Sequence, residues 1–328
     1  VDYMAKREGH PYIPGAVAPA FDYLNPERRE TQAVRNIGGG QVPVVLSARL
    51  DGSTDFDPQL RPDYVYAGRH LPDHLPEGVE CIVDADLWQG QPGIWPAFKT
   101  DQLPFMSACT AGLKFLFITY MGLDEEALAC LKYHPEIVLI AQSNHANRLG
   151  EFRALVHQLM CEGLKNPVIF FQHYAEQQVE DFQLKAAADM GALLMDGLCD
   201  GIFLFDQGAV PHATVDATAF GILQAARART SKTEYISCPG CGRTLYDLPG
   251  TIARIKAATA HLKGLKIGIM GCIVNGPGEM ADADYGYVGA GRGKVSLYKK
   301  KECIEKNIPE EEAVERLIAL IKQNGDYR

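Results

Sequence analysis

Short apolar runs alternate with helix-like patterns over the first part of the chain. The runs predict strands at residues 42–47, 64–67, 81–84, 115–120, 137–141, 168–172 and 202–205. Several runs are continuously apolar, which is typical of strands that are covered on both faces in a parallel sheet. Apolar residues at helical spacing predict the covering helices at residues 125–132, 148–162, 179–195 and 214–229. The alternation therefore predicts an α/β domain with a parallel sheet.

The number of predicted strands indicates how this sheet closes. Seven strands come close to the eight of a (β/α)₈ barrel. The segments that follow Ser47 and Ala67 are short and rich in proline, so they leave little room for full helices. We therefore predict a degenerate TIM-barrel-like domain over residues 1–231, with a doubly wound sheet as the alternative.

The pattern changes near residue 232. A strand at residues 234–237, a second at 266–270 and a hairpin at 285–288 and 295–298 are expected, and the C-terminal helix begins at Pro309. Between the first two strands, apolar residues at helical spacing predict a helix; they are Leu245, Leu248, Ile252, Ile255 and Leu262. Residues 232–328 therefore read as a small open α/β sandwich, with one sheet and helices on a single face.

Composition narrows the class of protein. The 328 residues include 32 Lys and Arg against 41 Asp and Glu, a net charge of −9, which argues against a general nucleic-acid binder. No apolar run approaches the about 20 residues that cross a membrane, and no secretion signal is visible at the start. Nine cysteines without a small disulfide framework fit a reducing compartment. We expect a cytoplasmic protein, or one of the plastid stroma if the source is a plant.

Three cysteines form the clearest chemical pattern. Cys238 and Cys241 have C-x-x-C spacing, which lets two thiolates reach one metal centre. Cys272 adds a third thiolate from a glycine-rich loop directly after a predicted strand, where backbone can approach an inorganic cluster closely. The alternative is a redox dithiol or a non-enzymatic zinc-binding interaction module, in which Cys303 would be the fourth zinc ligand. No second C-x-x-C accompanies Cys303, so the zinc pattern is half met.

Two longer motifs enclose these cysteines. They are KTEYISCPGCGRT at residues 232–244 and MGCIVNGPGEMADAD at residues 270–284. In this order and spacing they resemble the 4-hydroxy-3-methylbut-2-enyl diphosphate synthases, iron–sulfur enzymes of the non-mevalonate isoprenoid pathway. The resemblance implies that residues 232–328 form the cluster-binding reductase domain of that family.

The resemblance also implies a ligand set. The family holds a 4Fe-4S cluster with three cysteines and a glutamate seven residues after the third, so the implied ligands are Cys238, Cys241, Cys272 and Glu279. Glu279 is the implied catalytic residue, because a carboxylate is harder and more easily displaced than a thiolate and can yield its iron to a substrate oxygen. The implied reaction is reductive ring opening and dehydration of 2-C-methyl-D-erythritol 2,4-cyclodiphosphate to 4-hydroxy-3-methylbut-2-enyl diphosphate. Reduced ferredoxin or flavodoxin is the implied electron donor.

The domain order of the family predicts the identity of the first domain. Shorter members have a catalytic TIM barrel followed directly by the cluster domain, whereas plant-like members carry an extra barrel-like domain between the two. Residues 190–201 are similar to the end of that extra domain. We therefore predict the C-terminal part of a plant-like, three-domain member that lacks the catalytic TIM barrel, with residues 1–231 as a spacer. Because the missing barrel would hold the cyclodiphosphate substrate, this piece alone is expected to be inactive.

A group of lysines follows the predicted hairpin in an otherwise acidic chain: Lys294, Lys299, Lys300, Lys301 and Lys306. An acidic ferredoxin or flavodoxin could be steered to such a surface. Equally, lysines can protect an exposed sheet edge from pairing with another chain.

Overall fold

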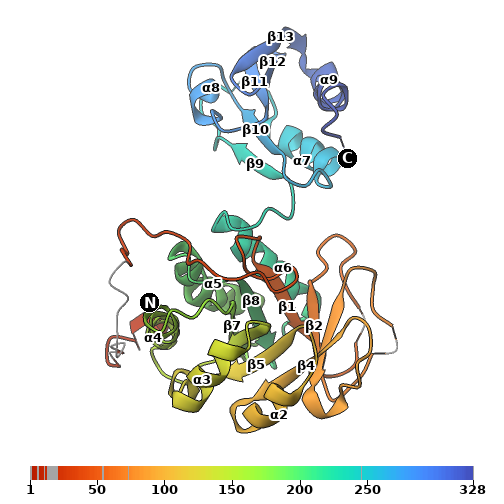
Figure 1. The fold of residues 1–328 in the computed structure, drawn as a ribbon. Coiled ribbons are helices and arrows are strands. Elements are labelled where there is room, and N and C mark those ends of the chain that lie inside the picture. The colour runs from red at the N-terminus through yellow and green to blue at the C-terminus, as the bar shows by residue number, and fades with distance from the viewer. Residues whose placement is uncertain are drawn as a thin grey trace. The chain divides into compact units, whose positions relative to one another are not determined.

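A computed structural model describes residues 2–5, 7–10, 12, 21–53, 55–72, 74–244 and 246–327. The chain divides into two compact units, Val1–Arg229 and Thr230–Arg328 (Figure 1). Leu245, which the sequence pattern assigned to a helix, lies outside the described residues.

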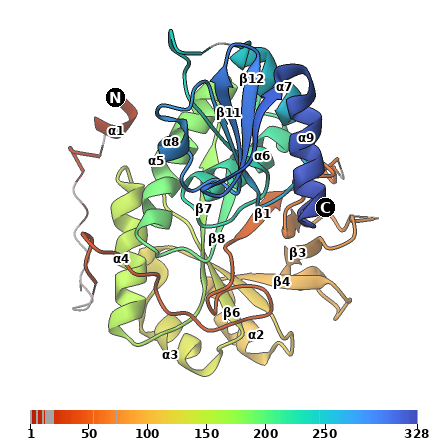
Figure 2. The same cartoon turned by 90° about the horizontal axis from the view of Figure 1, so that it is seen from above.

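The first unit is a closed barrel of parallel strands (Figures 1 and 2). In chain order its strands are β1 (Val44–Ala48), β2 (Tyr64–Gly68), β3 (Glu80–Asp84), β4 (Ile94–Lys99), β5 (Lys114–Ile118), β6 (Ile137–Ala141), β7 (Val168–Tyr174) and β8 (Gly201–Asp206). The last strand pairs with the first, with Val44 opposite Gly201, so the sheet has no free edge. This closure excludes the doubly wound alternative.

Most residues on both faces of the barrel strands are buried. On β6, Val138 and Ile140 pack inside the barrel, while Ile137, Leu139 and Ala141 join the layer between the barrel and its helices. Successive side chains of a strand point to opposite faces, so a strand covered on both faces has apolar residues at every position. This is the physical reason why the barrel strands appear in the sequence as continuous apolar runs.

One strand, β4, escaped the sequence prediction. It contains Pro96, which has no backbone N–H to donate to a neighbouring strand and usually argues against a central strand. Here Pro96 lies opposite Val83 of β3, and buried Phe98 follows it. The eight strands form a complete parallel barrel, so the prediction that this chain lacks a TIM barrel is wrong as stated.

The helices of the barrel are unevenly distributed. They are α2 (Leu103–Ala108), α3 (Glu125–Tyr133), α4 (Arg148–Cys161), α5 (Val179–Met195) and α6 (His212–Ala225), after a short α1 (Asp2–Ala5). Among the described residues no α-helix lies between β1 and β4, as the short proline-rich connections predicted. The barrel is degenerate in its helices and complete in its strands. None of the described helices combines the length and apolar character needed to cross a membrane.

The second unit is a five-stranded sheet with the order β13-β12-β11-β10-β9. Its elements are β9 (Glu234–Ser237), α7 (Leu248–Thr259), β10 (Lys266–Met270), α8 (Gly276–Glu279), β11 (Tyr285–Gly291), β12 (Lys294–Lys299), β13 (Glu302–Pro309) and α9 (Glu310–Gln323). The three strands β9, β10 and β11 are parallel, and the hairpin β11–β12 is antiparallel as predicted. The C-terminal helix begins after Pro309, also as predicted.

The two faces of this sheet are covered differently. Ile255 of α7 and Leu317 of α9 pack on one face, against Ile267, Tyr287 and other strand residues. On the other face, buried Met280 lies directly after α8 and packs with Met270, Val288 and Tyr298. The long helices thus share one face, while the loop that carries α8 covers part of the opposite face.

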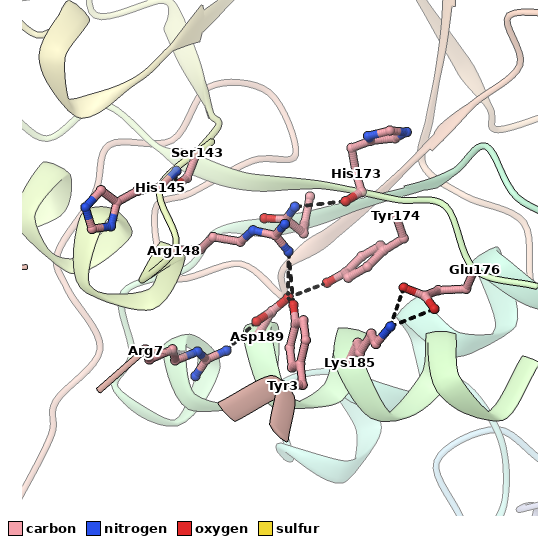
Figure 3. Close-up of polar contacts among 11 residues, drawn as sticks. Tyr3, Arg7, Ser143, His145, Arg148, His173, Tyr174, Glu176, Lys185 and Asp189 are labelled. Atoms are coloured by element: carbon pink, nitrogen blue, oxygen red, sulfur yellow. Dashed lines mark hydrogen bonds and ion pairs between the residues drawn. The ribbon is translucent and has the colours of Figure 1, made fainter. Parts of the chain in front are cut away.

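A buried carboxylate fixes the N-terminal segment to the barrel (Figure 3). Asp189 of α5, whose side chain is 2% exposed, accepts hydrogen bonds from the hydroxyls of Tyr3 and Tyr174 at 2.6 and 2.9 Å and pairs with Arg7. Arg148 donates to the Tyr3 hydroxyl at 3.0 Å and lies 3.7 Å from Asp189. Burial and the carboxylate raise the pKa of both tyrosines, so both hydroxyls stay protonated as donors.

We predict that Asp189→Ala destabilises the barrel, because it leaves buried cationic and hydroxyl groups without their acceptor. The free energy of unfolding should fall by about 3–5 kcal/mol. Both tryptophans of the chain, Trp88 and Trp95, lie in the first unit, so tryptophan fluorescence during urea unfolding reports on that unit alone. Gln183→Ala, at an exposed position of the same helix, is the matched control and should stay within about 0.5 kcal/mol of the parent chain. An unchanged urea midpoint in Asp189→Ala would contradict this account.

Candidate metal centre

The pairing of two parallel strands brings the first and third cysteines together. Ser237 at the end of β9 lies opposite Ile269 of β10. Cys238 follows directly, and Cys272 lies two residues beyond the end of β10. The carboxyl ends of neighbouring parallel strands share one edge of a sheet, so both thiols reach the same edge. The backbone N–H of Gly271 donates to the Cys238 sulfur at 3.1 Å, which ties the two loops to each other.

A pocket of about 200 Å³ opens at this edge. All four residues named from the sequence line it: Cys238, Cys241, Cys272 and Glu279. Arg243 and Asn275 add a cationic and an amide group to its lining. The structure therefore brings the four side chains to one pocket from three separate segments of the chain.

The C-x-x-C turn is held by its own backbone. Gly240 has a φ of 83°, in the left-handed region that glycine adopts without strain. The backbone N–H of Cys241 donates to the Thr244 hydroxyl at 3.2 Å, and the N–H of Thr244 donates to the Cys241 carbonyl at 2.9 Å. These two bonds close the turn around Cys241, and Thr244 is the last residue of the first sequence motif.

Arg243 changes the acidity of the neighbouring Cys241 thiol. The backbone N–H of Arg243, followed by its guanidinium, holds the pKa of the exposed Cys241 thiol below its usual value. The pKa of Arg243 is raised in turn, mainly by Cys241, with Cys272 and Glu279 contributing. A lowered thiol pKa favours the thiolate, which is the form that binds a metal.

The donor set, three thiols and a carboxylate, is compatible with an iron–sulfur cluster, whose protein ligands are mainly thiolates. Zinc needs its ligands converging at about 2.0–2.3 Å from one ion. In the part of the chain that the structure describes, no three His, Cys, Asp or Glu side chains converge in this way. A four-iron cluster instead takes each ligand on a different iron, so ligands spread around a pocket suit it. Cys303 of β13, the candidate fourth zinc ligand, does not line the pocket, and its thiol lies near the Glu305 carbonyl at 3.7 Å.

Close packing under α8 sets the position of Glu279. A Cβ atom on Gly276 would lie 2.8 Å from the Met270 Cβ and 3.1 Å from a Val288 methyl, so only glycine lets α8 approach the sheet this closely. The N–H of Glu279 donates to the Asn275 carbonyl at 2.9 Å. The close approach of Gly276 and this hydrogen bond therefore fix the backbone from which the Glu279 side chain extends.

The lysines do not form one surface beside the thiols. Lys294 lies opposite Gly291, beyond the carboxyl end of β10 where the cysteines lie. Lys300 donates its N–H to the Asp284 carbonyl at 2.7 Å, just before β11 begins, so it lies at the opposite edge with Lys301. Lys294 thus lies toward the cysteine edge, whereas Lys299, Lys300 and Lys301 lie toward the opposite one.

Comparison with known proteins extends the resemblance found in the two motifs. Residues 234–323 match the family model described as the GcpE protein C-terminal domain. This match runs from β9 to the end of α9 and contains the four pocket-lining side chains named from the sequence.

Similar proteins extend the match to the barrel. Three are named 4-hydroxy-3-methylbut-2-en-1-yl diphosphate synthase (flavodoxin). That of Bacteroides thetaiotaomicron is 71% identical over 324 residues, which cover 99% of this chain and 53% of the relative. Those of Phocaeicola vulgatus and Porphyromonas gingivalis are 66% and 44% identical, over 100% and 99% of this chain and 53% and 51% of the relatives. The predicted resemblance is confirmed, and the chain spans about half the length of these relatives.

We predict that Gly276→Ala loosens α8 and the sheet below it. The added methyl would overlap Met270, and relief of such overpacking should lower the stability of the second unit by about 1–3 kcal/mol. Amide hydrogen exchange in β10 and β11 measures this loss. Gly278→Ala in the same helix is the control, because its Cβ would meet nothing within 4 Å, and it should be neutral or slightly stabilising. Equal exchange rates in the two variants would refute the packing argument.

Proposed function

We propose that this chain is the C-terminal half of a 4-hydroxy-3-methylbut-2-en-1-yl diphosphate synthase, whose named members align along its whole length. In the whole enzyme it would take part in the reductive ring opening and dehydration of 2-C-methyl-D-erythritol 2,4-cyclodiphosphate. Two electrons and two protons enter the substrate, a C–O bond of the ring opens, and one oxygen leaves as water. The chain would serve as the iron–sulfur oxidoreductase part of that enzyme.

One observation carries this proposal. Three thiols and one carboxylate line a single pocket of about 200 Å³, and the two loops that bear Cys238 and Cys272 are joined by an N–H to sulfur hydrogen bond. Thiolates are the protein ligands of 4Fe-4S clusters, and N–H donors to sulfur tune the potential of such clusters. When bound, the cluster would supply the electrons and an iron that can accept a substrate oxygen.

The other residues of the pocket have distinct roles in this proposal. The Gly271 N–H would withdraw charge from the Cys238 sulfur, and the Arg243 guanidinium would attract an anionic substrate to the opening of the pocket. Glu279 would protect the reactive position until substrate arrives. The Asn275 amide also lines the pocket and would orient a substrate hydroxyl by hydrogen bonding.

We propose that the barrel, over residues 1–231, serves as a spacer. The diphosphate would bind at a site elsewhere in the whole enzyme. Two arginines follow its first strands, and both are already paired. Arg49 is buried against Asp216 at 2.6 Å, and Arg69 pairs with Asp86 at 2.8 Å. A diphosphate site needs cationic groups aimed at the phosphates. This chain alone is therefore expected to bind a cluster without turning over the cyclodiphosphate.

The sharpest test of the proposed function compares two ligands. In Glu279→Ala, three thiolates should still retain the cluster, so anaerobically prepared chain should keep most of its iron and sulfide. In the whole enzyme the same change should remove most activity, because the reactive iron position loses its protecting carboxylate. Cys272→Ser should instead lower the iron and sulfide content itself, since one of three thiolates is lost.

Iron and sulfide counts, electronic spectra and turnover in the whole enzyme separate these outcomes. A colourless protein with stoichiometric zinc would reject the cluster altogether. Unchanged activity and an unchanged spectrum in Glu279→Ala would exclude Glu279 as a ligand. The thiolates are tested separately, by Cys272→Ser.

An electron donor should dock at the cysteine edge of the second unit, because electrons must enter near the cluster. Reduced flavodoxin is the proposed donor, by the names of the relatives, with ferredoxin as the other carrier of this kind. We predict that Lys294→Glu slows reduction of the whole enzyme by acidic flavodoxin, and more so at low salt. Lys301→Glu, at the opposite edge, carries the same charge change and is the control. Equal rates for both variants at every ionic strength would disprove docking at this edge.

A further inference from the structure

The carboxyl-terminal mouth of the barrel has a polar rim. Along each strand every second side chain points toward the barrel axis, and the residues of the inner core show which ones these are. Following this alternation, the last inner positions are occupied by Asp84 of β3, Lys99 of β4, Thr119 after β5, Gln142 after β6 and His173 of β7. Polar side chains at the carboxyl ends of several different barrel strands are the arrangement from which TIM barrels build binding sites.

Aromatic rings form the floor beneath this rim. Tyr66 and Phe117 have ring centroids 5.2 Å apart, Phe117 and Phe171 6.2 Å, and Phe171 and Phe203 4.7 Å. Tyr66 and Phe203 complete the circle at 6.1 Å. Phe203 is buried, but the other three rings are only partly buried, although they point into the barrel. The side chains therefore fill the barrel below this level and leave it open above.

The open space is a pocket of about 400 Å³. Its lining combines floor and rim: Tyr66, Lys99, Thr100, Asp101, Phe117, Ile118, Thr119, Gln142 and Phe171. This volume lies in the range of about 300–1,000 Å³ that is usual for small-molecule sites. Mainly apolar walls with a few convergent polar groups are also typical of such sites.

Two polar groups of the lining are not used by the fold. The Lys99 ammonium makes no ion pair within the described residues. The Gln142 side-chain amide has no hydrogen-bond partner there, since only its backbone N–H donates, to Ile118. Tyr66 and Asp84, in contrast, satisfy each other through a 2.7 Å hydrogen bond. Lys99 and Gln142 are thus free to bind a ligand.

We propose that this mouth binds a small polyhydroxylated molecule with a single acid group, such as a sugar acid or a sugar monophosphate. The apolar C–H face of the molecule would lie on Phe117 and Phe171. The acid group would pair with Lys99, the one cation of the lining, and the hydroxyls would bond to Gln142 and Thr119. The carboxylate of Asp101 in the same lining disfavours a diphosphate, which distinguishes this ligand from the cyclodiphosphate.

Ligand-observed NMR with the chain tests this assignment, using D-gluconate and D-glucose 6-phosphate as probes. One acid should bind saturably, and the preferred acid identifies the carboxylate or the phosphate as the recognised group. Lys99→Met should weaken that binding roughly tenfold or more, and Gln142→Leu roughly three- to tenfold, by loss of charged and neutral hydrogen bonds. Lys132→Met, an exposed position of α3, removes the same charge outside the barrel and should leave binding unchanged.

Three results would overturn the proposal. They are no binding of either acid at millimolar concentration, binding of neutral D-glucose as tight as that of the acids, or binding that Lys99→Met and Gln142→Leu both leave intact. Tryptophan fluorescence unfolding verifies that each variant keeps a folded barrel. The iron and sulfide content of the chain is measured separately, so failure of this site and failure of the proposed metal centre are distinguishable.

Discussion

The parallel pairing of β9 with β10 is the constraint on which the candidate metal centre depends. Cys238 and Cys272 are 34 residues apart in sequence, and α7 lies between them. Hydrogen bonds between the two strands fix their register. The register in turn fixes the point at which each strand ends and its cysteine loop begins. A slip by one residue would turn Cys238 or Cys272 toward another face. The third and fourth pocket residues are then added by local devices, a glycine turn for Cys241 and a close-packed glycine under α8 for Glu279.

The same geometric rule governs the barrel. Its strands are also parallel, so their carboxyl ends all open at one mouth, where polar residues replace the apolar interior. At the cysteine edge the polar groups are thiols and a carboxylate around a small pocket. At the barrel mouth they are an ammonium and an amide above aromatic rings. The two units thus present different chemistry from the same kind of sheet edge.

Charged side chains are buried and paired in the barrel, whereas the charged group at the pocket of the second unit is exposed. Asp189 is enclosed and fully used by two tyrosines and two arginines, so it holds segments together and is closed to ligands. Arg243 is exposed beside Cys241, where solvent screens its charge but leaves it accessible. Ionic groups that are buried and fully paired, such as Asp189, are therefore structural, whereas exposed ones, such as Arg243, are available for binding.

The sequence by itself determined the motifs, the approximate positions of most strands and helices, and the residue types of the pocket. Continuous apolar runs gave the buried strands because both faces of each strand are covered, and the C-x-x-C spacing identified a local turn. The local sequence pattern did not predict β4, because Pro96 lacks the backbone N–H that a central strand residue usually donates. The strand forms because it pairs with the strands on either side of it. Closure of β1 on β8, the separation of Lys294 from Lys301, and the pocket at the barrel mouth were decided by tertiary structure alone. Each depends on which distant segments pair, and pairing between strands far apart in sequence leaves no local signal.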